Sequence, residues 1–186
     1  MYPELQRLDD QYAAAEADAR SLLESLASDE ARAAWRPAGG GWSVAECFDH
    51  LAITNQIYMS VMRPAADEAR RKARLRRGPA LPGFFGGWFV RSLEPPPKMK
   101  SKSPAVIRPR AEVKLSAAAA DFFASHAEAK KFFEDNADLD LAAIQFANPF
   151  IKGLRFSLAT GLHAIPAHER RHLYQARQIL SQSRGR

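Results

Sequence analysis

Apolar residues recur every three or four positions over four long stretches of the chain, and this spacing predicts amphipathic helices. The first stretch covers residues 3–27. Its apolar stripe consists of Leu5, Leu8, Tyr12, Ala15, Ala19, Leu22, Leu23 and Leu26. The pattern stops at residues 37–41, where Pro37 and Ala38 are followed by three glycines.

A second helix is predicted from Ser43 to about residue 64. Ser43 and Glu46 have the capping-box spacing, in which the serine hydroxyl and the glutamate carboxylate each accept a hydrogen bond from a free amide at the helix start. Apolar residues continue the stripe through Met62, and Pro64 could then end or kink the helix.

Two further helices are predicted near the C-terminal end. One runs from Ser116, as its cap, to about Asn136, and the other runs from Leu154 to Leu180 after a turn at Asn148-Pro149. Residues 64–115 between the second and third helices are predicted to be an irregular crossover, in which residues 81–90 form a short apolar segment. We therefore predict one all-α domain over residues 1–186, a four-helix bundle with a long irregular connection and no substantial sheet.

Length and composition fit this picture. The chain has 186 residues, of which 46% are hydrophobic, so one domain can bury a sizeable core. No run approaches 18 apolar residues, and the first seven residues lack an apolar signal core, so neither a membrane span nor secretion is expected. The single cysteine, Cys47, cannot form an internal disulfide, which fits a reducing cytoplasm.

The formal net charge is +6, and the excess is concentrated in basic runs at residues 70–77 and 98–110. Such runs can bind nucleic acid, but these lack the interleaved aromatic residues that would stack on bases. A solvated surface is the favoured interpretation, and the runs do not identify a partner.

The segment His168-Glu-Arg-Arg-His172 is the main candidate for chemistry. Two histidines four residues apart lie on one face of a helix, so both imidazoles could bind one metal ion. His50 on the second helix is the candidate third ligand. A histidine pair with this spacing on a surface helix can also have no function.

The segment also matches the H-E-x-x-H string of zinc peptidases, but after His172 the chain has no Asp, Glu, His or Cys to complete such a site. Glu169 points about 100° away from His168 around the helix, so we expect it to form salt bridges rather than act as a base.

Other residues are assigned by their positions. Gln175 shares the face of the two helix-four histidines, and Glu46 lies one turn before His50, so either could orient a ligand. Trp42 and Asn55 are candidate pocket residues. We expect His126 to be solvated; packing roles are expected for His163, Cys47 and Tyr58.

Three segments resemble the DinB-like superfamily. Gly41-Trp-Ser-Val-Ala-Glu-Cys-Phe-Asp-His-Leu51 is similar to its second-helix motif, and residues 148–154 resemble the segment before its last helix. Residues 167–175, Ala-His-Glu-Arg-Arg-His-Leu-Tyr-Gln, resemble its last-helix motif. Residues 64–115 carry no resemblance.

The resemblance implies an up-down-down-up bundle that binds a divalent metal ion through His50, His168 and His172. It also implies a small-molecule substrate, including low-molecular-weight thiols in the S-transferases of the family, and makes a homodimer reasonable.

Three imidazoles leave a metal ion with an open position, which serves a hydrolase or a thiol S-transferase equally well. Histidine ligands suit nickel, copper and iron as well as zinc, so the metal identity stays open. Zinc and nickel are the favoured metals, with manganese and iron as alternatives. The alternative is a non-catalytic binding module in which the metal only stabilises the fold. The sequence assigns no catalytic residue.

Overall fold

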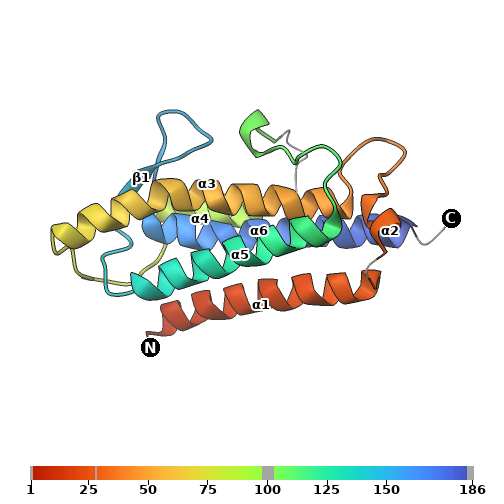
Figure 1. Cartoon of the computed structure of the whole chain (residues 1–186). Helices are drawn as coiled ribbons and strands as arrows, with labels where there is room; N and C mark the ends of the chain where they lie inside the picture. Colours follow the sequence, from red (N-terminus) through yellow and green to blue (C-terminus); the bar gives the residue numbers. More distant parts are fainter. Residues whose placement is uncertain (1, 28, 98–102, 184–186) are drawn as a thin grey trace.

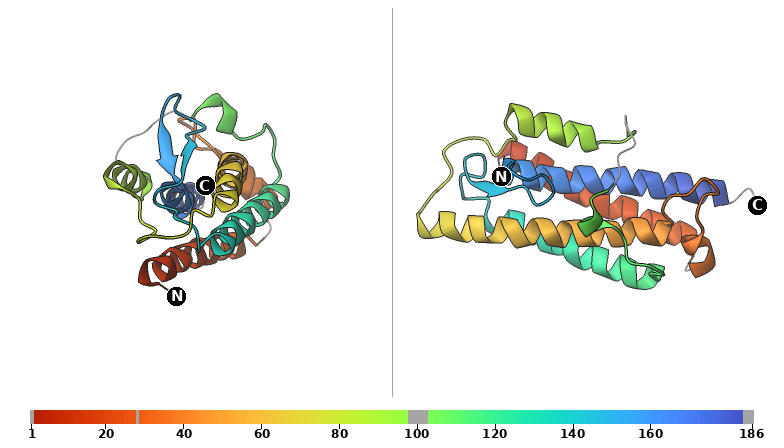
Figure 2. Two further views of the ribbon diagram at one scale, coloured as in Figure 1. Left: turned by 90° about the vertical axis from the view of Figure 1, so that its left-hand side faces the viewer. Right: turned by 90° about the horizontal axis from the view of Figure 1, so that it is seen from above.

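A computed structural model describes residues 2–27, 29–97 and 103–183. These residues are mostly helical, as predicted, and four long helices lie side by side (Figures 1 and 2). Within the described ranges, no helix combines the length and the apolar composition needed to cross a membrane. The elements are α1 (Pro3–Leu26), α2 (Glu30–Ala34), α3 (Val44–Arg71), α4 (Phe84–Leu93), the 3-10 turn η1 (Ala105–Ile107), α5 (Leu115–Asp135), β1 (Gln145–Ala147), β2 (Arg155–Ser157) and α6 (Leu158–Ser183).

The predicted first helix is confirmed. Proline stands at the start of α1, where its missing amide hydrogen costs nothing. The helix ends at Ala27, which adopts a left-handed conformation with φ of 47°. The buried stripe consists of Leu5, Leu8, Tyr12, Ala15, Ala19, Leu22 and Leu26.

The capping box at the start of α3 is also confirmed. The Ser43 side chain accepts a hydrogen bond from the Glu46 amide, and the Glu46 carboxylate accepts one from the Ser43 amide at 2.8 Å. The predicted end near Pro64 is wrong, because α3 continues to Arg71. Pro64 lies on the exposed face, so water can satisfy the carbonyl that it leaves free, while Met62 and Ala66 on the opposite face stay buried.

The prediction that residues 64–115 are irregular is wrong for residues 64–71 and for α4, which packs against α6. Gly86 permits this contact, because a Cβ atom there would lie 2.2 Å from the Thr160 hydroxyl oxygen. The opposite side of α4 presents Phe84, Phe85 and Trp88 to solvent.

Helix α5 begins at Leu115 without a side-chain cap from its own segment, so the predicted cap at Ser116 is wrong. The carboxylate of Glu30 on α2 accepts hydrogen bonds from the amides of Leu115 and Ser116 at 2.8 and 3.1 Å. A distant acidic residue thus satisfies the free amides of this helix end.

Helix α6 begins four residues later than predicted, because Arg155–Ser157 pairs with Gln145–Ala147 as a short antiparallel ladder. Phe146 and Phe156 face each other in this pairing and are both buried. The expectation of no substantial sheet still holds for the described residues.

The core consists of two apolar clusters, one toward each end of the long helices. One contains Tyr12, Met62 and Leu162, and the other contains Leu22, Phe48 and Leu173. Between them lie polar side chains from α3, α5 and α6. We call these residues the polar belt: His50, Thr54, Asn55, Ser125, His126, His168, Glu169 and His172.

Candidate metal centre

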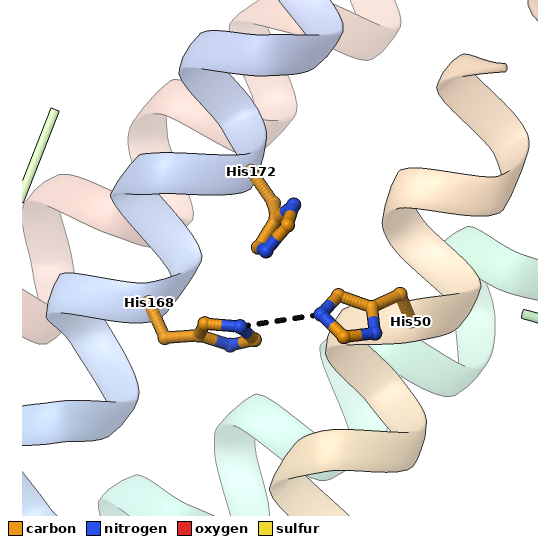
Figure 3. A group of neighbouring side chains, drawn as sticks. All are labelled: His50, His168 and His172. Carbon is orange, nitrogen blue, oxygen red and sulfur yellow. Dashed lines mark hydrogen bonds between the residues drawn. The ribbon is translucent and has the colours of Figure 1, made fainter. Parts of the chain in front are cut away.

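The three predicted histidines converge in the polar belt. His50 extends from α3 toward α6, and His168 and His172 extend from successive turns of α6 toward α3 (Figure 3). Each offers one ring nitrogen to a group in which all three atoms lie within 4.8 Å of one another. The Nε2 atoms of His50 and His168 are 3.2 Å apart.

Hydrogen bonds fix the outward nitrogen of two of these rings. Nδ1 of His50 lies 2.6 Å from the carbonyl oxygen of Ile107, and because a carbonyl can only accept, this nitrogen carries the proton. Nδ1 of His172 lies 2.9 Å from Oε1 of Gln175, an amide oxygen that can likewise only accept, so this Nδ1 also carries the proton. Both rings therefore turn an Nε2 lone pair inward, as metal-ligating histidines do.

His168 differs from the other two rings. Its side chain is half-buried as a whole, yet its Nδ1 atom is inaccessible and has no hydrogen-bond partner among the described residues. Its Nε2 atom faces the other two rings (Figure 3).

The environment keeps these imidazoles neutral. Burial lowers the pKa of His50 to about 4. Burial and the neighbouring imidazoles lower the pKa of His168 and of His172 well below the ordinary histidine value. Neutral imidazoles are the form that binds metals, so the charge state at neutral pH suits coordination.

The donor set fits a divalent ion. Two nitrogens bound to one tetrahedral zinc at about 2.1 Å would be about 3.4 Å apart, close to the 3.2 Å between His50 and His168. Three neutral nitrogen donors would leave at least one coordination position for water or substrate.

Of the four residues predicted to accompany the ligands, two contact a candidate ligand and two have other partners. Gln175 contacts a candidate ligand, as described above. Trp42 lies beside the site with its ring tilted against two of the imidazoles, its centroid 4.5 Å from that of His50 and 5.5 Å from that of His172. Glu46 is engaged by the helix cap and by an ion pair with Arg36. Asn55 donates a hydrogen bond to Glu169 rather than to a candidate ligand.

His126 is not solvated, contrary to the sequence-based expectation. Its side chain is 2% exposed, and its Nδ1 atom lies 3.0 Å from the carboxylate of Glu169, which is fully buried. Burial opposes a charge on His126, but the hydrogen bond to Glu169 and its negative charge outweigh this effect and raise the His126 pKa. The salt bridge expected of Glu169 thus has His126 as its partner whenever this imidazole is protonated.

The sequence reasoning also missed Asp49, the residue before His50. Its side chain is 0% exposed, and it accepts hydrogen bonds from Arg110 in the connection that precedes α5. Local helical periodicity does not predict this contact, because the burial of the Asp49 carboxylate depends on a partner that lies 61 residues away.

The remaining candidates have packing contacts. Cys47 is buried, and burial raises its thiol pKa. Tyr58 lies in the core, and His163 is buried with Nε2 3.4 Å from the Ala80 carbonyl.

In the basic run at 70–77, Arg70 pairs with Asp138 and Arg76 with Glu4. In the second run, residues 98–102 lie outside the described residues.

Comparisons with curated proteins and with solved structures found no match. The model of the DinB superfamily matches residues 11–176, which include all three candidate ligands and most of the chain. The chain therefore belongs to the DinB superfamily.

Proposed function

We propose that this protein binds one divalent metal ion through His50, His168 and His172 and uses it as a small-molecule enzyme, either a thiol S-transferase or a hydrolase. The observation that carries the proposal is the convergence of three neutral imidazoles, two of them buried and one half-buried. The two buried imidazoles have their outward nitrogen fixed by an acceptor. Zinc and nickel are the favoured metals, with manganese and iron as alternatives.

The scaffold of this site is proposed to be an up-down-down-up four-helix bundle. The course of the chain supports it, because α1 and α6 run in one direction and α3 and α5 run in the other (Figure 1). Such a bundle builds metal sites from side chains on facing helices, and α3 and α6 face each other here.

A metal ion bound at this position would supply a positive charge that ionises a coordinated water or thiol near neutral pH. The residues of the chain have separate tasks. The three imidazoles hold the charge in place, and Ile107 and Gln175 orient two of them through hydrogen bonds. The Trp42 ring packs against the rings of His50 and His172 and so helps to hold both in place.

Metal content tests the proposal. We expect about one metal ion per chain by elemental analysis after incubation with zinc or nickel and removal of loosely bound ions. His168→Ala should lose the metal while its far-ultraviolet circular dichroism stays that of wild type. Tyr174→Ala, an exposed change on the same helix, is the matched control and should retain it. A wild-type protein that remains metal-free after incubation with zinc, nickel and manganese contradicts the proposal.

The second candidate is a non-catalytic module in which the ion only stabilises the fold. It is favoured by the separation of the ligands, since an ion would tie together residues 50 and 168, which lie on different helices. A metal titration of thermal stability combined with a turnover screen separates the candidates. Strong stabilisation without turnover of any electrophile–thiol pair or hydrolysable ester favours the module.

A further inference from the structure

The segment before α5 is tied to α3 beside the candidate metal centre. The guanidinium of Arg110 donates to Oδ1 of Asp49 from Nε at 2.8 Å and from Nη2 at 2.5 Å, and the Arg110 amide donates to Oδ2 at 2.7 Å. The same guanidinium also pairs with Asp121 on α5 at 2.7 Å. Asp49 therefore has both carboxylate oxygens occupied, in a position from which solvent is excluded.

This attachment fixes the position of Ile107. Only two residues separate Ile107 in η1 from Arg110, and the Ile107 side chain is itself buried. The carbonyl of Ile107 lies 2.6 Å from Nδ1 of His50, the residue next to Asp49. One short segment thus contacts two successive residues of α3, by an ion pair at Asp49 and by a carbonyl at His50.

The carbonyl decides which nitrogen of His50 can bind a metal. A neutral imidazole carries one proton, which can be on either nitrogen. An acceptor at Nδ1 keeps the proton there and leaves the lone pair on Nε2, the atom that faces His168. Without that acceptor, a proton on Nε2 would have to move before a metal could bind.

We infer that Asp49 and Arg110 are positioning residues of the metal centre, whose ion pair holds the Ile107 carbonyl against His50 and thereby prepares His50 for coordination. The inference rests on the proposed metal binding. It assigns a role beyond packing to a buried carboxylate that is not itself a candidate ligand, and it predicts that a change at residue 110 acts on the metal.

The test compares two arginine variants. Arg110→Gln removes the guanidinium from Asp49. Arg177→Gln is the matched control, because Arg177 also pairs with one aspartate, Asp18, through Nε at 2.8 Å, but on the α1–α6 side of the fold. Zinc affinity is measured by competition with a chromophoric chelator, and folding by circular dichroism and thermal unfolding. We expect Arg110→Gln to bind zinc 10- to 100-fold more weakly than wild type, the range for changes to groups that orient ligands. Arg177→Gln should stay within twofold.

A second measurement uses the metal-free protein. Nitrogen-15 spectra of the imidazole rings distinguish the two tautomers, and we expect His50 to carry its proton on Nδ1 in wild type and to populate both tautomers in Arg110→Gln. If Arg110→Gln does not fold, Arg110→Lys replaces it. This variant retains the charge but not the forked geometry, so its zinc affinity should also fall below that of wild type.

The outcomes separate the two proposals. Zinc affinity of a folded residue-110 variant within twofold of a metal-binding wild type overturns the inference and leaves the proposed function intact. A wild type that binds no metal overturns the proposed function and the inference that rests on it. A His50 that keeps its Nδ1 proton in the folded variant overturns the proposed link from Arg110 to Ile107, whatever the metal content.

Discussion

Replacing Glu169 with alanine should destabilise the protein strongly. The Glu169 carboxylate is fully buried and accepts hydrogen bonds from two side chains of the polar belt. Nδ2 of Asn55 donates at 2.8 Å, and Nδ1 of His126 lies 3.0 and 3.1 Å from the two carboxylate oxygens. Alanine would leave Nδ1 of His126 buried without an acceptor and Nδ2 of Asn55 with only a long contact, 3.5 Å, to the Ser125 hydroxyl. It would also remove the main interaction that raises the His126 pKa.

The size of the effect follows from these contacts. Each buried donor that loses its partner costs about 1–3 kcal/mol, so the two together cost about 2–6 kcal/mol. Removing one partner of a buried ion pair costs about 3–5 kcal/mol, which agrees with this sum. We therefore expect the free energy of unfolding to fall by about 4 kcal/mol, which lowers the melting temperature by about 10 °C in a domain of this size.

Urea unfolding of the metal-free protein at pH 7, followed by circular dichroism, measures this change. Glu128→Ala is the control, because Glu128 pairs with Arg63 at 2.6 Å on the exposed surface, where such pairs contribute less than about 1 kcal/mol. A loss below about 1 kcal/mol in Glu169→Ala, equal to that of the control, would refute the assignment of Glu169 as a buried structural partner of His126.

Three other predictions concern packing, protonation and capping. Gly86→Ala should lower the free energy of unfolding by about 1–3 kcal/mol in urea titrations, because the new Cβ collides with Thr160; Thr160→Ala in the same chain should restore part of it, and an unchanged unfolding midpoint contradicts the close packing. The metal-free protein should lose stability as pH falls from 6.5 toward 4, because His50 has an ordinary pKa when unfolded and a pKa of about 4 when folded, so the unfolded chain takes up the proton first. The protonation of His50 alone changes the free energy of unfolding by up to about 3 kcal/mol. The urea midpoints at pH 7 and pH 4.5 should therefore differ less in His50→Asn than in wild type, and equal differences in the two proteins contradict this prediction. Glu30→Ala should cost about 1 kcal/mol in thermal unfolding, because the amide of Leu115 loses its acceptor, whereas an unchanged melting temperature would show that water replaces the cap.

Features that depend on neighbours in the sequence were predictable. The stripe of α1, the capping box of α3 and the shared face of His168 and His172 all follow from helical spacing within a few residues. The meeting of these two histidines with His50 is different, because no local spacing relates residues 50 and 168. His50 was a candidate ligand from its place on the second predicted helix of a bundle, and the resemblance of the flanking segments to a known family made its meeting with the other two an expectation.

Features that depend on distant partners could not be predicted from local patterns. The start of α5 is capped by Glu30 on α2, so the nearby Ser116 misled the prediction of its first residue. Helix α3 passes Pro64 because buried contacts on its other face outweigh one missing hydrogen bond. His126 follows a run rich in alanine and precedes charged residues, and only the position of Glu169 on α6 explains its burial.

The segment from His168 to His172 shows why a short motif needs its surroundings to be interpreted. In a zinc peptidase with this string, the glutamate acts as a general base on a metal-bound water and must face the ion. Here both oxygens of Glu169 are within hydrogen-bonding distance of His126 on α5, in a position closed to solvent. A carboxylate that is held in this way cannot reach a water on the histidine face. The same five residues therefore serve two separate purposes, with the histidines forming the candidate metal site and the glutamate joining α6 to α3 and α5.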